Sequence, residues 1–391
     1  MDYEFLIVGA LLFVAVISGW LLGRRTLQSD AGNNRFIMHP EYFKGLNYVL
    51  NEQPDKAIEV FVKMLEVDSE TVETHLALGN LFRRRGEVDR AIRIHQNLIA
   101  RPSLEKDQRA LALLELGMDY MRSGLLDRAE SLFNELIEMG MYRKQAYREL
   151  LDIYQQEKDW DKAITTARKL ENVTAESLAH VIAQFYCEQA ADHLRNGRMS
   201  QFRERIGKAL TNDPDCVRAS IMTGNQELKS GNVREALKAY KRIESQDIDF
   251  ISEVIAPMHE CYKSNGKMDE FIEFLRKITE QTGSITALLT LVRLIAERDG
   301  EDEASRLIIT ELRKRPSVRG VDRLLEFALH NTSGETRDSL LTIKDLTGEL
   351  LKNRSAYRCN QCGFEAKALH WQCPGCKTWS SVKPIYGIEG E

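Results

Sequence analysis

The stretch HLALGNLFRRRGEVDRAIRIHQ, from His75 to Gln96, carries the clearest structural pattern in the chain. Gly79 and Phe82 are three places apart, which puts them on one face of a helix. Gly86 follows, and glycine accepts the left-handed conformation in which many helices end. Ala91, twelve places after Gly79, is small enough to let a second helix approach the first closely. The stretch therefore predicts two packed helices joined by a tight turn.

The same spacing recurs along the chain, as a starting residue followed by positions three, twelve and sixteen places later. The eight sets are Gly45, Tyr48, Ala57, Phe61; Gly79, Phe82, Ala91, His95; Gly117, Tyr120, Ala129, Phe133; Leu151, Tyr154, Ala163, Ala167; Ala190, His193, Phe202, Ile206; Gly224, Glu227, Ala236, Tyr240; His259, Tyr262, Phe271, Leu275; and Val292, Ile295, Ala304, Ile308. Glycines stand where the turn between the two helices is expected, at Gly86, Gly124, Gly197, Gly231 and Gly266. Acidic residues stand where second helices begin, at Glu87, Asp127, Asp161 and Glu235. Prolines stand near the ends of repeats, at Pro102, Pro214 and Pro316. Regular spacing of this length indicates an array of structural repeats.

This pattern resembles the tetratricopeptide repeat over residues 35–320. The resemblance implies an all-α solenoid, and the helices expected from Val321 to Lys352 extend it as a degenerate C-terminal cap. We therefore expect four parts: a transmembrane anchor at 1–23, a cytoplasmic tether at 24–34, the array at 35–352 and a small module at 353–391.

An apolar run without a formal charge, FLIVGALLFVAVISGWLL, lies between Phe5 and Leu22. As a helix it spans roughly 27 Å, close to the hydrocarbon thickness of a bilayer. A cleaved signal peptide normally begins with basic residues, whereas acidic residues precede this run. A buried helix of a soluble protein normally shows a polar stripe, and this run has none. We expect a single membrane span. The membrane-flanking residues are Trp20, Arg24 and Arg25, and the two arginines place the bulk of the chain in the cytoplasm and the N-terminus in the periplasm.

Four cysteines close to the C-terminus form two C-x2-C pairs: Cys359 with Cys362, and Cys373 with Cys376. Two such pairs complete a tetrahedral S4 site, for which zinc and iron are both suitable. Disulfides are the alternative, and a cytosolic location disfavours them. A module of about 35 residues cannot build an adequate core, so the metal is expected to supply much of its folding free energy.

The module resembles a rubredoxin-type or zinc-ribbon domain, with Tyr357, Phe364, Trp371 and Trp379 expected to pack around the site. Two departures, the short spacer and Lys377 in place of the usual glycine, favour a structural role over electron transfer. From Leu351 onward, basic residues outnumber acidic ones by six to three. We expect the module to dock on the repeats, whose net charge is negative. The other cysteines, Cys187, Cys216 and Cys261, are expected to be packing residues rather than reactive thiols.

The composition argues against several classes of protein. A net charge of −5 does not suit a nucleic-acid-binding protein. We find no phosphate-binding loop, dinucleotide fingerprint, metalloprotease motif or nucleophile elbow, so we expect no enzyme. Repeat arrays of this kind are usually binding surfaces. The candidate groove residues on first helices are Asn80, Arg83, Arg84, Arg122 and Asn225, and solvated surface side chains are the alternative interpretation.

The order of anchor, repeats and terminal cysteines resembles the lipopolysaccharide assembly protein B family of Gram-negative bacteria. The resemblance is detailed in His75–Gln96 and in YRCNQCGF, from Tyr357 to Phe364. It implies a non-catalytic adaptor at the cell inner membrane that presents the lipid A pathway deacetylase to a membrane-anchored AAA zinc protease. It also implies restraint by a second inner-membrane protein and a role in gathering lipopolysaccharide-synthesis enzymes. The alternative from another class is a redox module whose S4 iron passes electrons to a docked partner.

Overall fold

The computed structural model describes residues 40–67, 71–330, 332–352, 354–388 and 390. Two compact units divide the chain, residues 1–146 and residues 147–391. The predicted anchor and tether, and with them Trp20, Arg24 and Arg25, lie outside the described residues. Within the described part of the chain, no helix combines the length and apolar character needed to cross a membrane.

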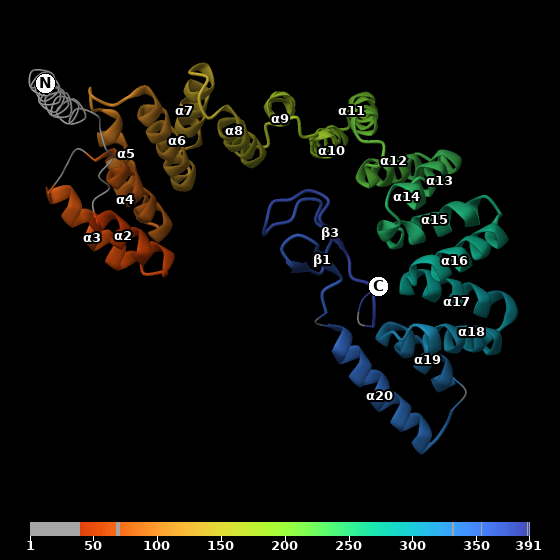
Figure 1. Ribbon diagram of the computed structural model, residues 1–391. Coiled ribbons are helices and arrows are strands. Elements are labelled where there is room, and N and C mark those ends of the chain that lie inside the picture. The colour runs from red at the N-terminus through yellow and green to blue at the C-terminus, as the bar shows by residue number, and fades with distance from the viewer. Residues whose placement is uncertain (1–39, 68–70, 331, 353, 389, 391) are drawn as a thin grey trace, which may run out of the picture. The chain divides into compact units, whose positions relative to one another are not determined.

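The first unit consists of consecutive helix pairs (Figure 1). The pairs are α2 (Pro40–Leu50) with α3 (Pro54–Val67), α4 (Val72–Arg85) with α5 (Val88–Ile99), and α6 (Lys106–Ser123) with α7 (Leu126–Glu138). The pair predicted from His75–Gln96 is α4 and α5, and Gly86 ends α4 with a φ of +88°. The predicted turn is therefore confirmed, since glycine accepts this conformation without a steric cost.

The second unit continues the array and ends in the small module. Its helices are α8 (Arg143–Glu157), which begins just before the boundary, α9 (Trp160–Thr174), α10 (Ala179–Arg195), α11 (Met199–Asn212), α12 (Val217–Lys229), α13 (Val233–Lys241), α15 (Ser252–Ser264), α16 (Met268–Thr282), α17 (Ile285–Asp299), α18 (Glu301–Lys314), α19 (Val318–His330) and α20 (Glu335–Lys352). A short helix, α14 (Ile243–Gln246), and a 3₁₀ turn, η2 (Ile248–Phe250), interrupt the pattern after α13. The predicted C-terminal cap corresponds to α19 and α20.

The predicted spacing has a direct packing cause. At Gly45, Gly79, Gly117 and Gly224, an added Cβ would lie only 2.3–2.6 Å from a ring atom of the residue sixteen places later. The ring of the second helix thus rests on the backbone of the first. The residues twelve places on are all buried: Ala57, Ala91, Ala129, Ala163, Phe202, Ala236, Phe271 and Ala304. The small and bulky residues of each set therefore pack the two helices together.

The C-terminal module contains a three-stranded antiparallel sheet in the order β2-β1-β3. Its strands are β1 (Tyr357–Cys359), β2 (Glu365–Ala366) and β3 (Val382–Pro384). In this register Tyr357 lies opposite Ala366 on one side and Pro384 on the other. Cys359 lies opposite Val382, so the sheet holds the first cysteine pair beside the C-terminal strand.

Candidate metal centre

Two tight turns bring the cysteine pairs together, and both turns have the same backbone form. In the first, the N–H of Gly363 donates to the carbonyl of Cys359 at 2.9 Å. In the second, the N–H of Lys377 donates to the carbonyl of Cys373, also at 2.9 Å. Gly363 has a φ of +76° and Lys377 a φ of +61°. The conformation explains why glycine is usual at the second position, where this chain has a lysine.

The four cysteine sulfurs form the cluster that the sequence predicted. The Sγ atoms of Cys359, Cys362, Cys373 and Cys376 all lie within 4.8 Å of one another. Cys359 and Cys376 are 3.7 Å apart at sulfur, and Cys362 and Cys373 are 3.6 Å apart. A tetrahedral ion with metal–sulfur bonds of about 2.3 Å places its sulfurs about 3.8 Å apart. The cluster therefore fits one S4 ion, zinc or iron, which when bound cross-links the two turns.

Neighbouring groups favour thiolates at two of these positions. Burial opposes a charge on Cys359, but hydrogen bonds with the hydroxyl of Ser381 and with the backbone N–H groups of Cys362 and Gln361 outweigh it, and the pKa of Cys359 falls to about 6. The pKa of Cys376 is lowered by its hydrogen bonds with the side chain and backbone of Thr378. Thiolates are the form in which cysteine binds metal, so this environment prepares the site for a cation.

The four aromatic residues of the module divide into two pairs. Tyr357 and Phe364 pack on the small core formed by Cys359, Cys373 and Val382, as predicted. The ring contacts of Trp371 and Trp379 are instead with helices of the array. The expectation that both tryptophans pack around the metal site is therefore wrong, because their rings lie against aromatic rings of the array, Trp160, Phe185 and Phe250.

Trp379 anchors the module on α8 to α10. Its indole N–H donates to Oε1 of Gln155 at 2.8 Å, and its ring meets Phe185 edge-on with centroids 5.8 Å apart. The side chain of Trp379 is 7% exposed. The next residue of the module, Ser380, accepts a hydrogen bond at its hydroxyl from the side chain of Gln184, on α10, at 3.0 Å. Direct hydrogen bonds thus accompany the burial of the indole ring.

A second set of contacts joins the module to the segment between α13 and α15. Trp371 stacks on Phe250 with ring centroids 5.5 Å apart. The ammonium group of Lys383 lies 2.9 Å from Asp247 and 2.8 Å from Asp249. Burial opposes its charge, but the two carboxylates outweigh burial and raise the pKa of Lys383. The docking predicted from the sequence is therefore confirmed, and a basic module residue meets acidic array residues as expected.

The first strand of the module and the segment after its last strand are also fixed to the array. Tyr357 donates its hydroxyl to Glu253 at 2.8 Å, and Tyr386 donates to the carbonyl of Asp249 at 2.7 Å. The N–H of Val318, at the start of α19, donates to the carbonyl of Ile388 at 2.8 Å. Within the second unit, the module lies inside the curve of the helices (Figure 1). It contacts the first helices α8, α10, α12 and α15, the side on which a solenoid of this kind binds its partners.

Comparisons with known proteins agree with this architecture. Residues 357–384 match a family described as a rubredoxin metal binding domain, and residues 74–110 and 114–176 match tetratricopeptide repeat families. The lipopolysaccharide assembly protein B of Escherichia coli K12 is 39% identical over 97% of this chain and 98% of its own. The Haemophilus influenzae protein of that name is 35% identical over 97% of this chain and 98% of its own. The chain belongs to the lipopolysaccharide assembly protein B family. A crystal structure of MamA is 21% identical, with a TM-score of 0.33, and covers 44% of this chain and 94% of its own.

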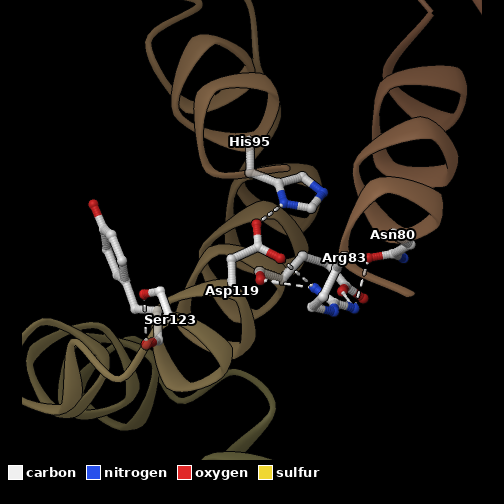
Figure 2. Close-up of polar contacts among 7 residues, drawn as sticks. Asn80, Arg83, His95, Asp119 and Ser123 are labelled. Carbon is white, nitrogen blue, oxygen red and sulfur yellow. Dashed lines mark hydrogen bonds and ion pairs between the residues drawn. The ribbon is translucent and has the colours of Figure 1, made fainter. Parts of the chain in front are cut away.

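In this member of the family, the candidate groove residue Arg83 has an intramolecular role. Its guanidinium lies 2.8 Å from Asp119 and 2.6 Å from Glu115, both on α6, and only 18% of its side chain is exposed. Asn80 accepts a further hydrogen bond from it at 2.7 Å (Figure 2). Asp119 is fully buried and also contacts His95 at 2.5 Å. The network links α4, α5 and α6, so Asn80 and Arg83 stabilise the first unit, and their role toward a partner stays a prediction.

The other candidate groove residues differ in their surroundings. Arg84 and Arg122 are exposed, on α4 and α6. Asn225, on α12, is exposed as well, and its side-chain oxygen accepts a hydrogen bond from Tyr240 at 2.8 Å. Partner binding by these three residues also stays a prediction. The two arginines are the cleaner test, because substituting Asn225 would also disturb the buried ring of Tyr240.

Sequence reasoning missed the array residues that receive the module. Gln155 and Gln184 stand at ordinary positions of α8 and α10, and no repeat pattern distinguishes them. Asp247 and Asp249 offered a weak signal, because the polar run ESQD after Ile243 breaks the helical pattern. The irregular segment places both carboxylates at the ammonium group of Lys383.

Proposed function

We propose that the protein is a non-catalytic, membrane-anchored adaptor that limits lipopolysaccharide synthesis. It presents the lipid A pathway deacetylase to a membrane-bound AAA zinc protease at the cell inner membrane. The supporting observation is the family relationship, which extends over 97% of the chain and includes both the repeats and the metal module. An inner-membrane regulatory protein restrains it, and other lipopolysaccharide-synthesis enzymes gather on the same array.

The topology is part of this proposal. The run Phe5–Leu22 crosses the inner membrane once, with the N-terminus in the periplasm and the array in the cytoplasm. A reporter fused after Glu391 is expected to be active only in the cytoplasm. Activity in the periplasm would overturn the topology and would allow disulfides at the four module cysteines.

The position of the module suggests where the partner binds. In the second unit it contacts the first helices α8, α10, α12 and α15, on the side where repeat arrays usually bind. Two of the first helices of the first unit, α4 and α6, carry the exposed Arg84 and Arg122. We place an acidic surface of the partner on these two helices.

The half-life of the deacetylase in cells tests the adaptor role. Cells lacking the protein receive the full chain, a chain that begins at Gln28, the pair Cys359→Ser and Cys362→Ser, or the pair Arg84→Glu and Arg122→Glu. Each of these three changes is expected to lengthen the half-life several-fold, as loss of the whole protein would. Arg93→Glu is the matched control, since Arg93 is an exposed cation on α5, a second helix. Unchanged half-lives in all of them would contradict the adaptor role.

A further inference from the structure

Two buried cysteines outside the metal site face each other in the second unit. Cys187 lies on α10 and Cys216 directly precedes α12, and their Sγ atoms are 3.8 Å apart. They are 0% and 2% exposed. A disulfide has a sulfur–sulfur bond of about 2.05 Å, so the two sulfurs need to approach by about 1.8 Å. The expectation that each is merely a packing residue did not foresee this pair, because a whole helix, α11, separates the two in the sequence.

The surroundings of the pair make the two sulfurs chemically different. A hydrogen bond joins the two sulfurs, and although burial opposes the charge, this bond and the N–H of Ala219 lower the pKa of Cys216. The same contact, together with burial, raises the pKa of Cys187. Gln184 adds a donor 3.6 Å from the sulfur of Cys216. This donor and the position of Cys216 at the N-terminus of α12 favour a thiolate there, so Cys216 is the nucleophile of the pair and Cys187 the resolving thiol.

Gln184 connects this pair to the metal module. Its Nε2 that faces Cys216 also donates to the hydroxyl of Ser380 at 3.0 Å. Its Oε1 lies 3.4 Å from the guanidinium of Arg218, which lies over the ring of Trp371 with 5.8 Å to the centroid. One amide side chain thus stands between the two thiols and the surface on which the module docks.

We propose that Cys187 and Cys216 are an oxidation site, at which a peroxide forms a disulfide that loosens the docking of the metal module on α10 and α12. The site differs from the four metal-binding cysteines, and nothing in the proposed adaptor role requires it. It would make the contact between array and module respond to oxidants.

The chemistry balances with hydrogen peroxide as the oxidant. The thiolate of Cys216 attacks one peroxide oxygen, the O–O bond breaks, and Cys216 becomes a sulfenic acid while hydroxide leaves and takes up a proton as water. The sulfur of Cys187 then attacks the sulfenic sulfur, the S–O bond breaks, and a second water leaves with the thiol proton. In total, two thiols lose two electrons and two protons, and one peroxide becomes two waters.

The disulfide affects docking for two reasons. The sulfur of Cys216 is drawn toward Cys187 when the bond forms, so Gln184 loses the sulfur that it faces and its bond to Ser380 is no longer held in place. The approach of the two sulfurs also shifts α10, which contains Cys187, relative to the start of α12, which follows Cys216. Phe185 on α10 and Arg218 on α12 move with these helices. These residues contact Trp379 and Trp371 of the module.

Peptide mapping tests the first step on the purified, metal-loaded full chain. After treatment with hydrogen peroxide, the tryptic peptides 170–195 and 209–218 are expected as one linked species that a dithiol reductant separates. Cys261→Ser is the matched control and keeps the link, because Cys261 is a buried cysteine on α15 outside the pair. Cys187→Ser loses the link. The proposal would be overturned if hydrogen peroxide oxidised the four module cysteines at doses at which peptides 170–195 and 209–218 stay unlinked.

Hydrogen exchange tests the second step. In the oxidised chain, residues 369–381 are expected to exchange several-fold faster than in the reduced chain, and reductant should restore the slow rate. Cys187→Ser, given the same dose, should keep the slow rate with its metal content unchanged, which separates this effect from oxidation of the metal ligands. A fully linked chain with unchanged exchange would also overturn the proposal.

Discussion

At the scale of single residues, the two cysteine turns show how one backbone form accepts different side chains. Gly363 adopts a positive φ without a steric cost, whereas Lys377 adopts it with a Cβ that crowds the backbone. We expect Lys377→Gly to stabilise the metal-loaded module by about 1 kcal/mol. Thermal release of the metal measures this, and Lys367→Gly is the control because Lys367, another exposed lysine of the module, is not among the described residues with positive φ. A lower release temperature for Lys377→Gly would contradict the strain argument.

Residue identity alone predicted the metal ligands but not the docking contacts. Two closely spaced cysteine pairs restrict the possible chemistry to a metal site or disulfides. The four cysteines could therefore be assigned as metal ligands before the fold was known. Gln155 and Gln184 could not, because a glutamine on a helix surface has no distinctive pattern until a partner lies against it. For the same reason the sequence could not tell whether Trp371 and Trp379 face the metal or the array.

Lys383 gives a pH and charge prediction at the same scale. Its pKa is raised above the ordinary value of 10.5, so its stabilising contribution is complete below that pH and is lost only as the pH rises through the raised value. We expect Lys383→Gln to weaken docking by about 1.5 kcal/mol at neutral pH. Hydrogen exchange of residues 369–381 measures the effect. Arg358→Gln, whose bond to Glu365 lies within the module, should leave that exchange unchanged.

At the scale of helices, the repeats depend on glycine beneath aromatic rings. A Cβ on Gly224 would lie 2.3 Å from the ring of the fully buried Tyr240, so Gly224→Ala forces the two helices α12 and α13 apart. We expect a loss of about 1–3 kcal/mol in the free energy of unfolding. Gly207 is the matched control, since it is a helical glycine on α11 with open space around its Cβ position. Gly207→Ala should stabilise by about 0.5–1 kcal/mol, and equal effects of the two changes would refute the packing argument.

The helix pairs could be predicted because their period has a packing cause that repeats. The segment after α13 could not, because α14 and η2 fit neither a longer helix nor a regular turn. Its Asp247 and Asp249 acquire a role only through Lys383, which lies in the last strand of the chain. Contacts between sequence-distant elements of this kind leave no local periodicity to detect.

At the scale of the whole molecule, the metal is expected to be structural. Elemental analysis should find about one zinc or iron per chain, and Cys359→Ser with Cys362→Ser should abolish it. No electron exchange with a partner is expected, since Lys377 and the short spacer depart from rubredoxins, and a colourless zinc protein would rule out the redox alternative. A red protein that exchanges electrons with a docked partner would support the redox alternative instead.

Metal loss should also weaken the second unit while sparing the first. Without the ion the module loses its cross-link, and a domain of this size cannot hold Trp371 and Trp379 against the array by its own small core. Phe185 and Phe250 would then face solvent, so chelation is expected to speed hydrogen exchange in α10 and η2 several-fold. The helices α4 and α6 should keep their protection, because the Arg83 network that joins them lies within the first unit. Equal losses of protection in both units would mean that chelation acts on the whole array, and not through the docked module.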